Sequence, residues 1–137
     1  MNDHLKIEKT LVIIKPDGVK RSLVGKIIEH YESKNLKIEA MKFIMASEEI
    51  LSQHYAEHVG KPFYDGLMSF MTSGPVVVMV LSGANAVESV RKINGETDAL
   101  KADMGSIRGQ YAYDKTENLV HGSDSLESAE REISIWF

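Results

Sequence analysis

Thr10-Leu-Val-Ile-Ile-Lys-Pro-Asp-Gly18 joins a continuous run of mostly β-branched residues to a proline, an aspartate and a glycine. An uninterrupted apolar run of this kind is typical of a central strand that is buried on both faces. Pro-Asp-Gly is typical of a turn, so we expect the strand to end there. Farther along the chain, Pro75 introduces the most apolar strand of the sequence, Val76–Leu81.

Between and beyond these two strands, the hydrophobic pattern alternates between helical and extended periods. Apolar residues from Leu23 to Tyr31 recur at helical spacing, with Ser22 as the expected N-cap. Leu36, Ile38 and Ala40 alternate with charged residues, and the phase changes at Met41, which predicts a half-buried strand with a β-bulge. The remaining expected elements are a helix from Ser47 to about His58, a short helix after Pro62, a helix over Asn85–Ile93 with Gly95 as C-cap, a strand over Asn118–His121, and a last helix that Asp124-x-x-Glu127 opens as a capping box.

The order of elements is therefore β-α-β-α-α-β-α-loop-β-α within a single domain of residues 1–137. The loop over residues 95–117 has no clear period, and loops of this length are usually functional. Four strands with a helix pair between the second and third favour an α+β, ferredoxin-like split-βαβ sandwich with a four-stranded antiparallel sheet. A doubly wound parallel sheet is the main alternative.

Composition limits the class of protein and its partners. The chain has 137 residues, of which 43% are hydrophobic and 26% charged, as in a globular domain. A net charge of −4 argues against stable nucleic-acid binding. There is no cysteine, the start of the chain resembles no secretory signal, and Val76–Leu81, the longest apolar run, is too short for a membrane span. We therefore expect a cytoplasmic protein.

Several common phosphate-binding motifs are missing. The sequence has no G-x-x-x-x-G-K-[ST] loop and no G-x-G-x-x-G fingerprint. Any phosphate must then be bound by side chains. Lys15 is the first candidate, because a lysine at the end of an apolar central strand needs an anionic partner or a cleft.

Three histidines could carry chemistry. His54 and His58 stand four apart on an expected helix, a spacing compatible with one metal, but no carboxylate motif completes a site. We interpret them as a solvated helix face and predict no metal site. His121 instead ends a strand and precedes Gly122-Ser123-Asp124 at the mouth of a helix, where an anion is favoured.

Glu132, two turns into that helix, could hold one ring nitrogen of His121. A neutral imidazole held in this way is a nucleophile toward phosphorus. The spacing alone leaves a second reading open, in which His121 is a buried polar residue at a capped strand end.

The segment Asn118-Leu-Val-His121-Gly-Ser-Asp-Ser-Leu-Glu-Ser-Ala-Glu-Arg-Glu132-Ile resembles the signature of nucleoside diphosphate kinases. The resemblance extends over about residues 9 to 137 without gaps. Its other matching segments are Ile14-Lys15-Pro16-Asp17-Gly18-Val19, His54-Tyr55, Lys61-Pro62-Phe63-Tyr64, Ser73-Gly74-Pro75-Val76-Val77, Arg91, Gly95-Glu96-Thr97 and Ile107-Arg108-Gly109.

The resemblance implies a ping-pong reaction. His121 would take the γ-phosphoryl group of a nucleoside triphosphate as phosphohistidine and pass it to a different diphosphate. The other implied catalytic residues are Lys15, Tyr55, Ser123 and Glu132, the last two positioning the imidazole and the arriving phosphate. The implied nucleotide-binding residues are Arg91, Thr97 and Arg108 for phosphates, Lys15 and Asn118 for ribose hydroxyls, and Phe63 for the base.

In the family, Mg²⁺ is carried by the nucleotide phosphates, and stacking on Phe63 implies broad base tolerance. Relatives form tetramers or hexamers built from dimers, so we expect a homo-oligomer of either kind. Asp98 and Ala99 stand where the family usually has asparagine and proline, and Met104 stands where a second proline is common. These changes should loosen a loop that contributes to subunit contacts.

The resemblance also implies a geometric requirement. Asn118 and His121 are three residues apart, so a regular strand would direct them to opposite faces. If both contact one ligand, the backbone between them must depart from strand geometry. A phosphohistidine carrier would need His121 without the ribose and base contacts, and a ferredoxin-like ligand-binding or RNA-binding module would need no nucleophile.

Overall fold

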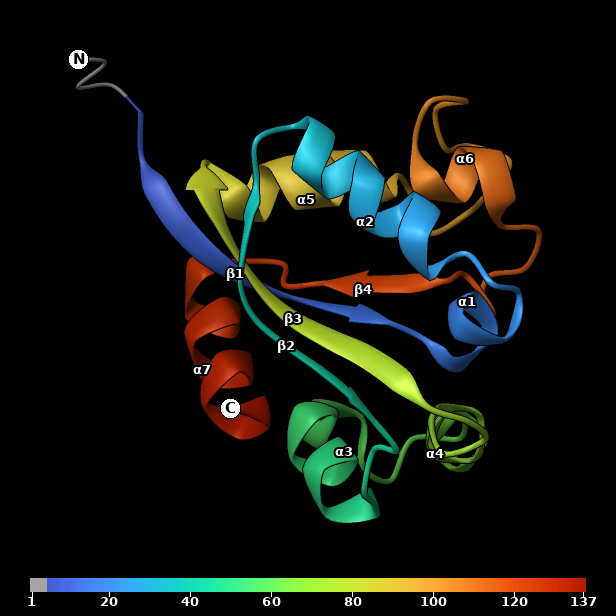
Figure 1. The fold of residues 1–137 in the computed structure, drawn as a ribbon. Helices are drawn as coiled ribbons and strands as arrows, with labels where there is room; N and C mark the ends of the chain where they lie inside the picture. The colour runs from blue at the N-terminus through green and yellow to red at the C-terminus, as the bar shows by residue number, and fades with distance from the viewer. Residues whose placement is uncertain (1–4) are drawn as a thin grey trace.

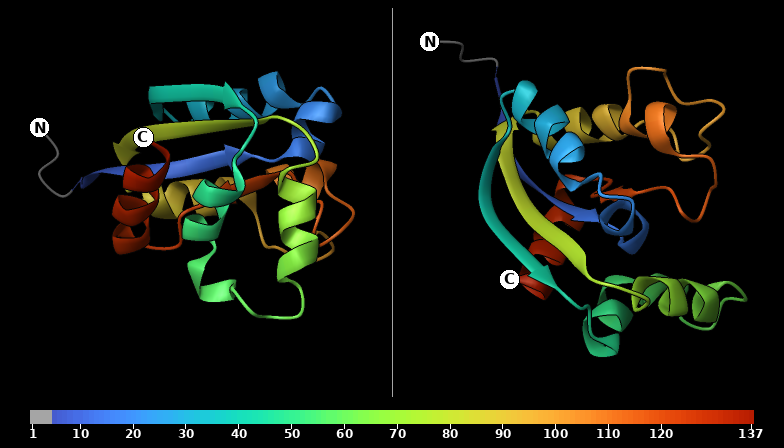
Figure 2. Two further views of the ribbon diagram at one scale, coloured as in Figure 1. Left: turned by 90° about the horizontal axis from the view of Figure 1, so that it is seen from below. Right: turned by 45° about the vertical axis from the view of Figure 1, so that its right-hand side comes forward.

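The computed structural model describes residues 5–137 as a four-stranded sheet with helices on both faces (Figures 1 and 2). Its strands are β1 (Ile7–Ile14), β2 (Lys37–Ile44), β3 (Val76–Ala84) and β4 (Val120–Gly122), in the order β2-β3-β1-β4. Each neighbouring pair is antiparallel. The predicted ferredoxin-like α+β sandwich is therefore confirmed, and the parallel alternative is wrong.

The helices connect these strands and cover both faces of the sheet. They are α1 (Pro16–Lys20), α2 (Val24–Ser33), α3 (Glu48–His54), the 3-10 turn η1 (Ala56–His58), α4 (Tyr64–Met71), α5 (Ala86–Asn94), α6 (Ile107–Tyr111) and α7 (Leu126–Trp136). In Figure 1, α2, α5 and α6 lie above the sheet, and α3, α4 and α7 lie below it. No helix among residues 5–137 is both long and apolar enough to cross a membrane.

The central strand β1 contributes to a core on each side of the sheet. Val12 and Ile14 pack toward α2 and α5, while Leu11 and Ile13 pack toward α3 and α7, and all four are fully buried. This alternation follows from the two-residue period of a strand. The prediction that the run from Thr10 is buried on both faces is confirmed.

Some element boundaries differ from the sequence prediction. The expected turn at Pro16 is the short helix α1, because proline is pre-shaped for a first helical position. Ser22 does not cap α2, since its φ of 59° is incompatible with the extended N-cap geometry, and Leu23 occupies the cap. In α7 the capping side chain is Ser125, one residue after the predicted Asp124.

Two further differences lie near the candidate site. The loop over residues 95–117 contains the short helix α6, capped by Ser106. β4 begins at Val120 instead of Asn118.

The predicted bulge in β2 is confirmed as a register shift between Ile38 and Ala40, slightly before the expected position. Ser47 caps α3 as predicted, but the helix ends at His54 and a separate turn follows.

Candidate active site

A cavity of about 660 Å³ opens beside the end of β4. It gathers seven of the predicted site residues from six separated stretches of the chain: Lys15, Phe63, Arg91, Thr97, Arg108, Asn118 and His121. The predicted residues Tyr55, Ser123 and Glu132 do not line it. Four cationic side chains and no carboxylate line the cavity among residues 5–137, so it is built for an anion.

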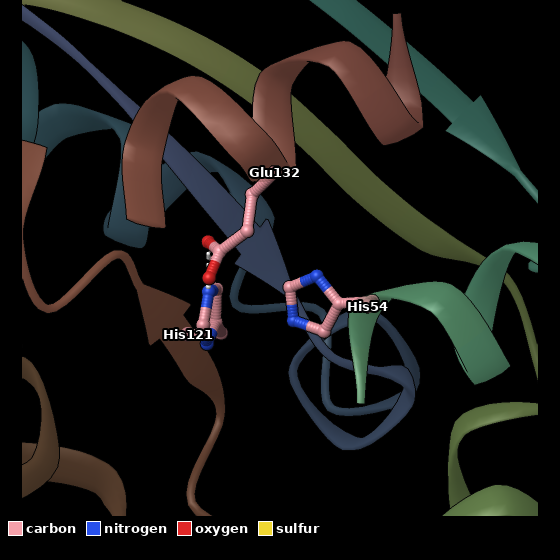
Figure 3. A group of neighbouring side chains, drawn as sticks. All are labelled: His54, His121 and Glu132. Carbon is pink, nitrogen blue, oxygen red and sulfur yellow. Dashed lines mark hydrogen bonds and ion pairs between the residues drawn. The ribbon is translucent and has the colours of Figure 1, made fainter. Parts of the chain in front are cut away.

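His121 is held from behind by a carboxylate. Its Nε2 lies 2.8 Å from Oε1 of Glu132, and the Ser123 hydroxyl donates to the same oxygen over 2.8 Å. Glu132 is 5% exposed and Ser123 fully buried, so Ser123 acts on the ring through Glu132 and does not reach the cavity. Figure 3 shows the other ring nitrogen of His121 directed away from Glu132. A neutral imidazole whose Nε2–H donates to a carboxylate keeps a free lone pair on Nδ1.

His54 is part of this arrangement, and its interpretation as a solvated residue is wrong. The side chain is 4% exposed, and its ring lies edge-on to that of His121 with centroids 4.6 Å apart. The indole N–H of Trp136 donates to Nδ1 of His54 over 3.0 Å. The sequence did carry a signal, because His54 stands three residues after the buried Leu51 and shares its helix face.

The protonation of His54 follows from these contacts. An indole N–H only donates, so Nδ1 of His54 must accept and the proton lies on Nε2. Burial, followed by the nearby His121 and Arg131, lowers the pKa of His54 to about 2. The ring is therefore neutral at any physiological pH.

This tautomer also bears on metal binding. One ligand atom each of His54, His121 and Glu132 lie within 4.8 Å of one another (Figure 3). A metal ligand must offer a lone pair, but Trp136 occupies that of Nδ1 in His54, and Nε2 carries the proton. The group therefore fits a hydrogen-bonded cluster that holds the His121 ring and does not fit a metal centre.

Tyr55 and His58 form an aromatic row that leads to Phe63. The ring of His58 lies 6.0 Å from that of Tyr55 and 5.2 Å from that of Phe63. Burial, with the charge of Glu132, raises the pKa of the Tyr55 hydroxyl, which keeps it a donor. His58 is half-buried, lies beyond the end of α3 and lines the cavity, so its interpretation as part of a solvated helix face is wrong too. Phe63 is 52% exposed at the cavity mouth, where a flat ligand could stack on it.

The cations of the cavity are anchored differently. Lys15 donates to the Asn118 side-chain oxygen over 2.9 Å, a neutral partner that leaves its charge free. Burial, more than the neighbouring Arg108, lowers the pKa of Lys15 to about 8. Within the described residues 5–137, Arg91 has a single long hydrogen bond of 3.4 Å, to the carbonyl of Gly122.

Arg108 has three backbone partners. Its guanidinium donates to the carbonyls of Gly95, Asn118 and Val120 at 2.8, 3.3 and 2.6 Å. It thus ties the loop that contains α6 to the start of β4. Burial lowers the pKa of Arg108, but a guanidinium stays charged in any case.

The backbone between Asn118 and His121 departs from strand geometry, as their shared cavity requires. Leu119 has a φ of 78°, and the N–H of Val120 donates back to the carbonyl of Asn118 over 2.9 Å. This tight turn brings both side chains to one cavity. The predicted departure is confirmed.

Comparison with known proteins identifies the family of this chain. The family model described as nucleoside diphosphate kinase matches residues 8–137. A nucleoside diphosphate kinase of Caldanaerobacter subterraneus is 55% identical over 131 residues, which cover 96% of this chain and 94% of the relative. One of Mycobacterium tuberculosis is 53% identical, with 95% and 96% covered.

Among solved structures, a halophilic nucleoside diphosphate kinase from Halobacterium salinarum in complex with CDP superposes with a TM-score of 0.92. It is 50% identical, and the match covers 96% of this chain and 88% of that one. Sheet, cavity and relatives together define a phosphotransferase. The chain belongs to the nucleoside diphosphate kinase family.

Proposed function

We propose that the family reaction, γ-phosphoryl transfer from a nucleoside triphosphate to a nucleoside diphosphate, proceeds in this chain through Nδ1 of His121. The Nδ1 lone pair forms a bond to the γ-phosphorus while the bond to the β-phosphate oxygen breaks, and the diphosphate leaves. A second diphosphate then attacks the phosphohistidine, and the N–P bond breaks. The observation that carries the proposal is the contact of 2.8 Å between His121 and Glu132 at the wall of a cationic cavity.

Electrostatic stabilisation supplies the rest of the chemistry. The charge of a transferring phosphoryl group is spread over its oxygens, so fixed cations stabilise it effectively. Arg91, Thr97 and Arg108 would bind the phosphates, with Lys15 near the transferring group. Tyr55 would act from behind the cavity by packing on His54, with the two ring centroids 4.6 Å apart.

Magnesium would arrive with the nucleotide. Because no carboxylate among residues 5–137 lines the cavity, the protein offers Mg²⁺ no ligand of the type it prefers. The ion would stay on the phosphates and neutralise part of their charge there.

Lys15 and Asn118 would bind the ribose hydroxyls, and Phe63 would stack on the base. Stacking on one exposed ring discriminates weakly between bases, so we propose broad base tolerance. The relative from Halobacterium salinarum was solved with CDP, a nucleotide of the proposed class.

We further propose that the chain acts as one domain, residues 1–137, in a homo-oligomer. The edge strand β2 presents Met41 and Phe43 at 54% and 64% exposure, and the loop carries Leu100 and Met104 at 97% and 81%. Two separate apolar surfaces support an assembly built from dimers, tetramer or hexamer. The net charge of −4 argues against stable nucleic-acid binding. We also propose a cytoplasmic location, because the chain has no cysteine and its proposed substrates are nucleotides.

A half-reaction with a chase tests the proposal. The protein is incubated with γ-labelled ATP and Mg²⁺, isolated, and then mixed with GDP. We expect an acid-labile label that moves to GDP, and no label in His121→Ala, which should still bind ADP. His30→Ala, which changes a histidine outside the cavity, is the matched control. Label that never leaves the protein would indicate a phosphocarrier, and no label at all would indicate a binding module.

A further inference from the structure

The turn at Leu119 is strained and lies between two residues of the proposed site. Its φ of 78° and the hydrogen bond from Val120 N–H to the Asn118 carbonyl define a three-residue turn with positive φ at its centre. Such turns are rare for a residue with a side chain, and they persist only where surrounding contacts hold them. Leu119 is also fully buried, so this turn is part of the packed interior and not an irregular surface loop.

The segment that follows β1 holds this turn through both backbone groups of Leu119. Lys15 N–H donates to the Leu119 carbonyl over 2.8 Å, and Leu119 N–H donates to Oδ2 of Asp17 over 3.2 Å. A Cβ at Gly18 would lie 3.3 Å from the Leu119 carbonyl oxygen and 2.8 Å from Ile14, so only glycine permits this close approach.

Asp17 is the side chain that holds the turn at Leu119 in this way, and a buried carboxyl group needs a physical explanation. It is 6% exposed, and its Oδ1 is buried without a hydrogen-bond partner among residues 5–137. Burial raises the pKa of Asp17, while the Lys15 ammonium and backbone N–H groups, including that of Leu119, oppose the rise. A half-satisfied buried carboxyl is unfavourable for folding, so its hold on Leu119 is the gain that explains it.

We propose that Asp17 is a positioning residue of the phosphotransfer site. By accepting the Leu119 N–H, it holds the turn that directs Asn118 into the cavity beside His121. The inference rests on the proposed function for the contact between Asn118 and the ribose. His121 has independent supports, since it pairs with Ile13 in the sheet and contacts Glu132. Asn118 lies outside the paired part of β4, and its hydrogen bonds beyond the turn itself are with the side chains of Lys15 and Arg108 and with the carbonyl of Lys115. None of these bonds fixes the backbone at Leu119, so the loss of Asp17 displaces Asn118 more than His121.

The test compares two nucleotides that differ only in the ribose hydroxyls that Asn118, together with Lys15, would contact. Dissociation constants for ADP and 2′,3′-dideoxy-ADP are measured by titration calorimetry for the wild type, Asp17→Ala and Asp17→Asn. Asp17→Ala should weaken ADP binding about tenfold, the effect of losing the hydrogen bonds between Asn118 and the ribose, and dideoxy-ADP binding less than about twofold. Asp17→Asn keeps an oxygen that accepts from Leu119 and should bind ADP within about threefold of the wild type.

A merely structural role for Asp17 would weaken both nucleotides alike, and that result would overturn the proposal. Unchanged ADP binding in Asp17→Ala, or an Asp17→Asn as weak as Asp17→Ala, would overturn it too. If thermal melting shows that Asp17→Ala does not fold, Asp17→Ser carries the same comparison. The proposed function fails separately, when the wild type binds nucleotides but passes no phosphoryl group to GDP. Equal affinity of the wild type for ADP and dideoxy-ADP would show that the ribose contact does not exist, and it would overturn this inference.

Discussion

The two walls of the cavity are built differently. On one wall, His121 comes from β4 and is held from behind by Glu132 of α7. Both elements pack on β1, and the hydrogen bonds from Glu132 to His121 and Ser123 are shielded from solvent. On the other wall, the side chains of Phe63, Arg91 and Thr97 are exposed. Phe63 and Thr97 come from loops, whereas Arg91 stands on the solvent side of α5, a helix that also packs on β1. The His121 ring is thus held in one orientation before any substrate arrives, whereas the exposed side chains of the other wall have few contacts that fix them.

This difference separates two functions that a kinetic experiment can resolve. Groups fixed before binding lower the barrier without reorganisation, so their loss reduces kcat. Groups that contact substrate in both ground and transition states mainly affect KM. The comparison predicts that substitutions behind His121 act on the chemical step and that those on the open wall act on binding.

Glu132→Gln should give the largest effect after loss of His121 itself. The neutral amide no longer stabilises the ring with its proton on Nε2, so the single-turnover rate of phosphorylation by ATP should fall about 10³-fold. The dissociation constant for ADP should change less than about twofold, because Glu132 does not line the cavity. Rapid-mixing kinetics measures the first quantity and calorimetry the second.

Glu130→Gln is the matched control, since it removes an exposed carboxylate from the same helix. It should leave both quantities unchanged. Equal losses in rate and in ADP affinity for Glu132→Gln would contradict the division between the two walls.

Arg108→Ala should have the next largest effect, and it should reduce both substrate turnover and the stability of the fold. Arg108 faces the cavity, but it also ties Gly95, Asn118 and Val120 together. We expect kcat/KM to fall about 10²-fold, as for a lost charge-assisted phosphate contact. The melting temperature should fall by about 5–10 °C, since each of the three hydrogen bonds contributes about 1 kcal/mol.

Arg91→Ala provides the comparison for Arg108. Arg91 has one long backbone contact, so its loss should reduce kcat/KM about tenfold and leave the melting temperature unchanged within about 1 °C. Two variants with the same kinetic and thermal effects would show that the contacts of Arg108 with the backbone do not stabilise the loop.

The sequence was sufficient to predict the strands and helices that support His121. Apolar periodicity alone predicted β1, β3, α5 and the order of the elements, because burial on two faces leaves an unambiguous pattern. Cap positions were less predictable. Ser22 is a favoured cap residue whose left-handed backbone prevents capping, and Ser125 stands next to Asp124, which is an equally plausible cap. The helix α6 was missed because its five residues are too few to show a period.

Residues that act through distant partners were the least predictable part of the site. His54 becomes a buried, neutral group through Trp136, which is 82 positions away. Asp17 read as a turn residue, and its contact with Leu119 spans 102 positions. Local patterns identify which side chains can do chemistry, but only the tertiary fold determines which of them meet.

Lys15 should show the smallest effect, as a pH dependence of nucleotide binding. Burial holds the pKa of Lys15 at about 8 in the free protein, below its ordinary 10.5. As the pH rises through 8, the ammonium loses its charge and the phosphates lose one cation, so the dissociation constant for ADP should rise up to about tenfold by pH 9.5. Calorimetry from pH 7 upward measures this in a range where the phosphates of ADP are largely ionised.

Lys15→Gln separates this group from the rest of the cavity, because its amide keeps a donor and cannot titrate. It should bind ADP weakly at pH 7 and show no further loss up to pH 9.5. The folding free energy gives a second readout with the opposite sign. Between pH 8 and 10.5 the unfolded chain holds the Lys15 proton more tightly than the folded one, so stability from this group rises with pH. An ADP affinity that is flat with pH in the wild type would place Lys15 among the fully charged cations of the exposed wall.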